Sequence, residues 1–160
     1  MMSSQELMKS WGEPEPVTRY VLGFLFSPDL EEVVLVEKTK PVWQAGLLNG
    51  VGGKIEDGET SVDAMVREFH EETGVHVVGW RPFSKMTGSD WTCDIFAAAS
   101  SSYDYCVTTT AKDKVTIIKT HDQYDYDVVS NLRWLVPMAI NYLETDNEFY
   151  TKICYGTNTQ

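Results

Sequence analysis

Residues 60–74 constrain the fold most strongly, because they define both ends of a helix. Thr60 is suited to cap the N-terminus, with Asp63 three residues later as the acidic partner of a capping box. Gly74 suits the left-handed position that ends a helix. At about 100° per residue, one side of this helix carries an apolar stripe of Val62, Met65, Val66 and Phe69. The stripe must be buried against other elements of the chain.

Apolar runs on both sides of this helix predict strands. They cover residues 19–26, 33–38, the glycine-rich 48–55, 75–86, 91–99, 115–119 and 131–136. A second helix is predicted to begin at Pro137 and to run to about Glu144, because proline favours the first helical turn. Strands outnumber helices, and two hairpins are visible. The order predicts an α+β fold, a mixed β-sheet with helices packed on it.

The length and composition predict one globular domain. A chain of 160 residues, 42% hydrophobic and 12% aromatic, can bury a substantial core. We expect an N-terminal arm at 1–16, a domain at 17–145 and a C-terminal tail at 146–160, in which Phe149, Ile153 and Tyr155 could dock. No apolar run approaches the roughly 18 residues that span a bilayer, and the first 16 residues contain no apolar signal core. We therefore expect a soluble cytoplasmic protein with no membrane partner.

The net charge of −11 bears on the partners of the protein. An acidic surface repels nucleic acid polymers, which bind basic patches. It also repels free nucleotides, unless a divalent cation lies between the protein and the phosphates. Three scattered cysteines, Cys93, Cys106 and Cys154, indicate neither a disulfide framework nor a cysteine zinc site.

Three glutamates, Glu68, Glu71 and Glu72, share a helix arc beside the apolar stripe. Two carboxylates about 5 Å apart repel by roughly 3 kcal/mol at an effective dielectric constant of 20. The ordinary alternative is a solvated acidic face, but such a face would carry lysine partners four residues on, and this one has none. A bound Mg²⁺ would turn the repulsion into attraction, since it prefers carboxylate and phosphate oxygens.

The residues before the helix fit such a site. Gly50, Gly52 and Gly53 leave the backbone bare for close approach of a ligand. Lys54 and Arg67 are the nearby cations, able to orient carboxylates or to contact phosphate. His70 lies on another face of the helix.

The segment GGKIEDGETSVDAMVREFHEETGV resembles a complete Nudix box, the signature of the Nudix hydrolases. Every fixed position is filled: Gly53, Glu59, Arg67-Glu68-Phe69, Glu71-Glu72 and Gly74-Val75. The resemblance implies an α/β/α sandwich over about residues 17 to 145. It also implies a hydrolase of phosphoanhydride bonds, which cleaves the pyrophosphate bond of a nucleoside diphosphate linked to a further group.

The resemblance implies roles for the site residues. Glu68, Glu71 and Glu72 would hold Mg²⁺, or Mn²⁺ in its place, with the backbone carbonyl of Gly52 or Gly53 as a further ligand. Either Glu68 or Glu72 would activate the attacking water. Arg67 and Glu59 would form an ion pair that fixes the loop and orients the glutamates, and Lys54 would neutralise phosphate charge. An additional metal-binding carboxylate is expected outside the box, with Asp104, Asp122, Asp125 and Asp127 as candidates.

Residues 43–50 are similar to those of MutT-like nucleoside triphosphate hydrolases. Asn49 would read a purine edge or, alternatively, cap a turn. Trp43 would stack on the base or cover the core. The predicted substrate is a purine nucleoside triphosphate or an oxidised purine deoxynucleoside triphosphate, giving monophosphate and pyrophosphate.

Other functions stay open. Within the hydrolases the alternatives are pyrophosphatases of ADP-ribose, dinucleotides or nucleotide sugars. From another class, some Nudix domains are non-catalytic ligand sensors, which usually lose box carboxylates that this chain keeps. The resemblance also raises the expectation of a homodimer.

Overall fold

Strand β1 (Thr18–Phe26) forms the centre of the sheet, because its side chains alternate between two buried faces. Leu22, Phe24 and Phe26 belong to one hydrophobic core, whereas Val21 and Leu25 belong to the other. The computed structural model describes residues 1–10, 18–110, 113–145 and 148–156, without the side chains of residues 8–10.

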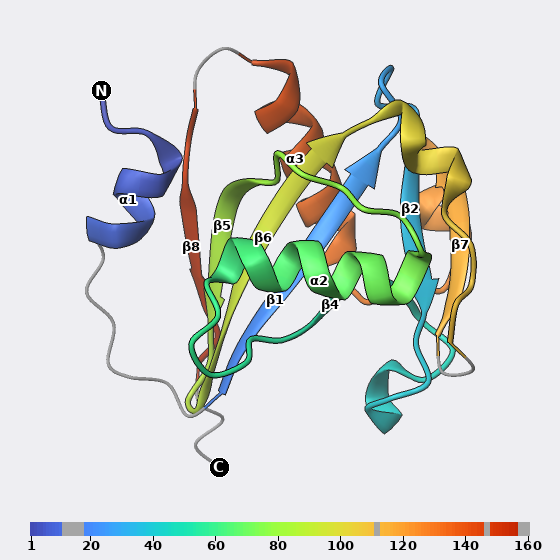
Figure 1. Cartoon of the computed structure of the whole chain (residues 1–160), viewed down its shortest axis with the longest axis horizontal. Coiled ribbons are helices and arrows are strands. Elements are labelled where there is room, and N and C mark those ends of the chain that lie inside the picture. Colours follow the sequence, from blue (N-terminus) through green and yellow to red (C-terminus); the bar gives the residue numbers. More distant parts are fainter. Residues whose placement is uncertain (11–17, 111–112, 146–147, 157–160) are drawn as a thin grey trace.

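The sheet is mixed and has eight strands (Figure 1). Its main path runs β3-β2-β1-β6-β5-β8, with β4 paired to β1 and β7 paired to β2. The β1–β6 and β5–β8 pairs are parallel, and the others are antiparallel. The remaining strands are β2 (Glu32–Glu37), β3 (Leu48–Asn49), β4 (Val51–Lys54), β5 (Arg81–Thr87), β6 (Trp91–Ala99), β7 (Lys114–Lys119) and β8 (Thr151–Cys154). The predicted mixed sheet and both predicted hairpins are therefore confirmed, although residues 75–80 lie outside β5.

Two helices cover opposite faces of the sheet, which confirms the predicted sandwich (Figure 1). Helix α2 (Ser61–Thr73) buries Met65 and Phe69 on one face. Helix α3 (Leu132–Glu144) buries Leu132, Leu135 and Tyr142 on the other. The other helical segments are α1 (Ser4–Ser10) and the 3₁₀ turns η1 (Val42–Gln44), η2 (Ser101–Tyr105) and η3 (Thr120–Asp125).

Both predicted ends of α2 are confirmed. The Thr60 hydroxyl oxygen accepts a hydrogen bond from the backbone N–H of Asp63 at 3.1 Å. Gly74 has a φ of 77° and donates its N–H to the carbonyl of His70 at 2.8 Å. These two caps fix which residues of the helix face the sheet.

The predicted strand at 131–136 is wrong, and so is the expectation that Pro137 opens a helix. Helix α3 begins at Leu132, and Pro137 lies in its interior, as does the exposed Trp134. Because proline has no N–H, the Arg133 carbonyl loses its helical partner. The hydroxyl of Tyr124 in η3 donates to that carbonyl at 3.3 Å, which helps the helix to tolerate the proline.

Both ends of the described chain pack at one edge of the sheet. Strand β8 pairs with β5, and Tyr150 is buried just before it. The Ser4 hydroxyl is 2.8 Å from that of Tyr142, and the Ser4 N–H donates to Glu148 at 2.9 Å. Most of the junction between the expected arm and domain, residues 11–17, lies outside the described residues. The boundaries at 17 and 145 stay predictions.

Candidate functional site

The box glutamates lie where α2 passes over β4. Glu68 and Glu72 are half-buried, whereas Glu71 is exposed. A Cβ atom on Gly53 would overlap with the carboxyl group of Glu68, and one on Gly52 would overlap with the carbonyl of Val21. The two glycines therefore allow the carboxylate to lie directly against the backbone of β4.

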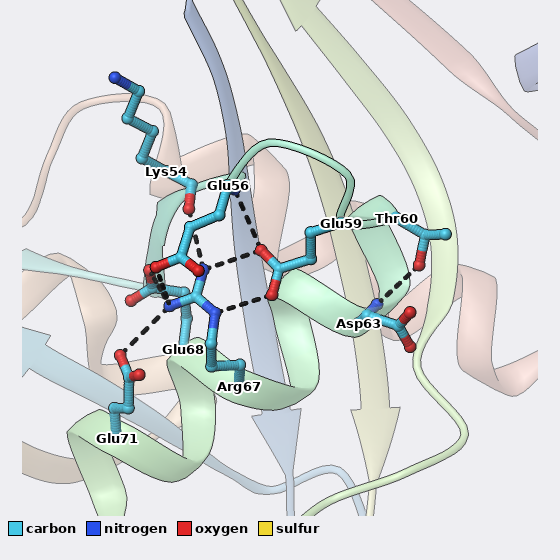
Figure 2. A network of polar contacts seen from close by, with 8 residues as sticks. All are labelled: Lys54, Glu56, Glu59, Thr60, Asp63, Arg67, Glu68 and Glu71. Carbon is cyan, nitrogen blue, oxygen red and sulfur yellow. Dashed lines mark hydrogen bonds and ion pairs between the residues drawn. The ribbon is translucent and has the colours of Figure 1, made fainter.

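Arg67 connects the loop before α2 to the glutamates (Figure 2). Its guanidinium donates to both oxygens of Glu59, from Nε at 2.7 Å and from Nη2 at 2.9 Å. Nη1 donates to Glu68 at 2.9 Å and to Glu71 at 3.3 Å. The predicted Arg67–Glu59 ion pair is thus present. The hydrogen bond from Arg67 holds the pKa of Glu59 below its usual value.

Lys54 contributes its backbone to this network. Its carbonyl oxygen accepts a hydrogen bond from Nη2 of Arg67 at 3.0 Å. Its side chain is exposed and extends away from the carboxylates (Figure 2). Contact between the Lys54 ammonium and a phosphate stays a prediction.

Burial makes both inner glutamates harder to ionise. Desolvation raises the pKa of Glu68, against the opposing hydrogen bond from Arg67. Desolvation also raises the pKa of Glu72, and the charge of Asp113 raises it further while Lys38 opposes. The Oε2 atom of Glu72 is buried and has no hydrogen-bond partner in the described part of the chain. The site therefore holds a carboxylate oxygen that still lacks a positive or donating neighbour.

Sequence reasoning missed Lys38 and Asp113. The Lys38 ammonium contacts Asp113 at 2.8 Å, and the Thr39 N–H donates to the same carboxylate at 3.1 Å. Asp113 is only 6% exposed, and its charge acts on Glu72. Residues 38 and 113 meet only because β2 pairs with β7, so no local signal identifies them.

The four aspartates that sequence reasoning favoured have other surroundings. Asp104, Asp125 and Asp127 are exposed. The remaining one, Asp122, lies 3.2 Å from the His121 imidazole. Asp113 is therefore the better candidate for a carboxylate outside the box, since it is buried and acts on Glu72.

The donor set fits a divalent cation. Among the residues that the structure describes, no three Asp, Glu, His or Cys side chains already form a metal cage. Nη1 of Arg67 lies between Glu68 and Glu71 instead. The unpartnered oxygen of Glu72 and the half-buried Glu68 are nevertheless the hard oxygen ligands that Mg²⁺ and Ca²⁺ prefer. A cation would compete with Arg67 for its carboxylates.

The two residues predicted to bind the base differ in their surroundings. The side-chain amide of Asn49 donates to Gln44 at 3.0 Å, and its oxygen accepts the N–H of Gly50 at 2.8 Å. Asn49 therefore caps its own turn, which was the alternative. Trp43 is 65% exposed in η1, so the expectation that it covers the core is wrong, and its ring is accessible.

A second cluster, at the start of α3, also escaped sequence reasoning. We call Trp91, Asn131 and Tyr155 the aromatic corner. The Asn131 amide donates to the Tyr155 hydroxyl at 3.3 Å, and the ring centroids of Trp91 and Tyr155 are 5.8 Å apart. The Asn131 Oδ1 atom is buried and unpartnered within the described ranges. The largest described cleft, about 350 Å³ between η3 and α3, is lined by neither this corner nor the glutamates.

The raised pKa of Glu72 predicts a pH-dependent stability. Because the folded state binds this proton more tightly, stability should fall as the pH rises above the ordinary glutamate pKa of about 4.3. Glu72→Gln should therefore lose less stability than the wild type between about pH 4.5 and 7.5. Urea unfolding in EDTA measures this, with the exposed Glu144→Gln as control. Equal pH dependence in wild type and Glu72→Gln would contradict the raised pKa.

Comparisons with known proteins agree with this geometry. A family model described as "NUDIX domain" matches residues 16–153. An uncharacterized Nudix hydrolase of Bacillus subtilis is 35% identical over 48 residues, which span 30% of this chain and 28% of that protein.

Solved structures share the fold. A MutT structure described for Aliivibrio salmonicida and Vibrio cholerae has a TM-score of 0.65 and 24% identity, covering 78% of this chain and 97% of its own. The NUDIX domain of Shewanella oneidensis NrtR, in complex with ADP-ribose, has a TM-score of 0.69 and 19% identity, covering 89% and 99%. The family model extends over most of the sequence and includes every box residue. The chain therefore belongs to the NUDIX domain family.

Proposed function

We propose that the protein is a Mg²⁺-dependent hydrolase of the pyrophosphate bond in a nucleoside diphosphate derivative. The observation that carries this proposal is the buried, unpartnered oxygen of Glu72 beside Glu68 and the bare backbone of Gly53. Nudix hydrolases act on pyrophosphate bonds and generally use divalent cations, which agrees with this donor set. No helix among the described residues is long and apolar enough to cross a membrane.

The residues divide the chemical work as follows. Glu68, Glu71 and Glu72 would hold the cation, with a backbone carbonyl of Gly52 or Gly53. When bound, the cation lowers the pKa of water and neutralises phosphate charge. Glu72 accepts the proton of the attacking water, because its Oε2 atom makes no competing hydrogen bond with the described residues. Arg67 keeps Glu68 in place through the loop that Glu59 anchors.

The substrate that we favour is a purine nucleoside triphosphate or its oxidised deoxy form, cleaved to monophosphate and pyrophosphate. The fold shared with MutT supports this choice. The accessible Trp43 and the unpartnered Asn131 oxygen offer a stacking face and an acceptor for a base. The favoured alternative is ADP-ribose, because a NUDIX domain of the same fold binds it. Homodimerisation and a cytoplasmic location stay predictions.

A hydrolysis screen tests the proposal. The protein with Mg²⁺ is incubated with nucleoside triphosphates, 8-oxo-dGTP, ADP-ribose, NADH and dinucleoside polyphosphates, and the products are identified. We expect the fastest turnover with a purine triphosphate, giving monophosphate and pyrophosphate. Turnover of ADP-ribose alone would select the alternative substrate. Nucleotide binding without any turnover, with Mg²⁺ or Mn²⁺, would identify a ligand sensor.

A further inference from the structure

One row of paired residues crosses the sheet from the box to the C-terminal strand. Tyr20 pairs with Lys54 of β4 and with Cys93 of β6, and Cys93 pairs with Met86 of β5. Residues that pair directly point to the same face of a sheet. Met86 and Cys93 belong to the core beneath α3, so Lys54 and Tyr20 also point to the α3 side. This row connects the end of the box strand to the aromatic corner.

Tyr155 reaches the aromatic corner because β8 extends the sheet. The Tyr155 N–H donates to the Thr87 carbonyl at 2.9 Å, which continues the pairing of β8 with β5. Its ring lies beside Trp91, and its hydroxyl lies 3.7 Å from the Met86 sulfur. Tyr155 remains 43% exposed, and Tyr20, along the row, is 40% exposed. The corner is thus held by strand pairing and still open to a ligand.

The corner has unused hydrogen-bonding capacity of both kinds. The Oδ1 atom of Asn131 is a buried acceptor without a partner in the described chain. The Tyr155 hydroxyl accepts from Asn131, and its own proton is directed only at a thioether, which is a weak acceptor. An acceptor and a donor therefore stand side by side next to two aromatic rings.

We propose that Tyr155 is a specificity-determining residue that holds the base of the nucleotide substrate, together with Trp91 and Asn131. The ligand class is a planar nucleobase whose edge offers an N–H donor beside an acceptor. Asn131 accepts from that donor, the Tyr155 hydroxyl donates to the acceptor, and the aromatic rings contact the face of the base. This inference rests on the proposed function, because it assumes a nucleotide at the box.

Methyl NMR on methionine-labelled protein tests the inference without turnover or metal. Guanosine or adenosine monophosphate is titrated in EDTA, and the Met86 methyl signal, assigned with Met86→Leu, reports on the corner. We expect this signal to shift with both mononucleotides and not with ribose 5-phosphate, which lacks a base. Purine riboside monophosphate, which lacks the N–H donor, should bind at least about ten-fold more weakly.

Two variants separate the ring of Tyr155 from its hydroxyl. Tyr155→Ala should weaken mononucleotide binding about ten-fold or more through lost stacking. Tyr155→Phe keeps the ring beside Trp91 and should weaken binding only of bases with an acceptor, by about five-fold. Thermal unfolding of Tyr155→Phe checks that β8 stays paired. Tyr105→Ala, at a tyrosine that is 74% exposed in η2, is the control and should bind like wild type.

The outcomes distinguish this inference from the proposed function. Unchanged binding in Tyr155→Ala, or a Met86 signal that does not move, would overturn the role of Tyr155 while leaving hydrolysis intact. Base-dependent binding that requires Tyr155, in a protein that hydrolyses nothing, would support the inference and contradict the proposed hydrolase.

Discussion

Replacement of Glu72 by glutamine should lower kcat by about 10³- to 10⁴-fold while the fold persists. Glutamine has nearly the same shape but cannot accept the proton from water, and it is a weaker ligand for a hard cation. The oxygen that changes is the one that is buried and makes no hydrogen bond with the described residues. Steady-state kinetics on the substrate found in the screen measures the loss.

Two controls make this prediction specific. His70→Gln, at an exposed residue of the same helix, should keep wild-type kinetics. Thermal unfolding with and without Mg²⁺ gives a second readout, because a ligand that binds only the folded state raises its stability. The Mg²⁺-induced rise in Tm should be smaller in Glu72→Gln than in the wild type. Full activity in Glu72→Gln would refute the assignment of Glu72.

Gly53→Ala should reduce kcat/KM by about 10²-fold, although it adds only one methyl group. The new Cβ would overlap with the carboxyl group of Glu68, so either the carboxylate or α2 must move. A displacement of that size is enough to misplace a catalytic group. Kinetics and thermal unfolding should be measured on the same preparation.

The matched control for Gly53→Ala is Gly79→Ala. Gly79 has a φ of 81°, so alanine there is strained, but its Cβ would meet no heavy atom within 4 Å among the described residues. This variant should lose stability without a comparable loss of kcat/KM. If both variants lose activity in proportion to stability, the contact between Gly53 and Glu68 has no special role.

The features that the sequence predicted well depend on local interactions. The caps of α2 join residues three or four positions apart, and the Arg67–Glu59 pair spans a single loop. The box motif adds to these local signals. Strands such as 91–99 and 115–119 were also predictable, because continuous apolar runs bounded by turns favour buried strands.

The prediction failed where local patterns are ambiguous or contacts are distant. Residues 131–136 form a short apolar run, which a buried strand and a buried helix share, and Pro137 favoured the wrong boundary. Its tolerance depends on Tyr124, which lies outside the helix. Asp113 and Tyr155 reach their neighbours only through strand pairing, so their surroundings cannot be seen in the sequence.

The parallel pairing of β1 with β6 also affects how the chain must fold. β1 ends at Phe26, but its central partner does not begin until Trp91, beyond the whole box and the β5 strand. During synthesis, β1 can pair with β2 and β4 while its other edge waits, apolar and open. Parallel pairs so far apart in sequence form slowly. The rate at which this enzyme reaches its active form, and its tendency to aggregate on the way, should therefore depend on the arrival of β6 more than on the box itself.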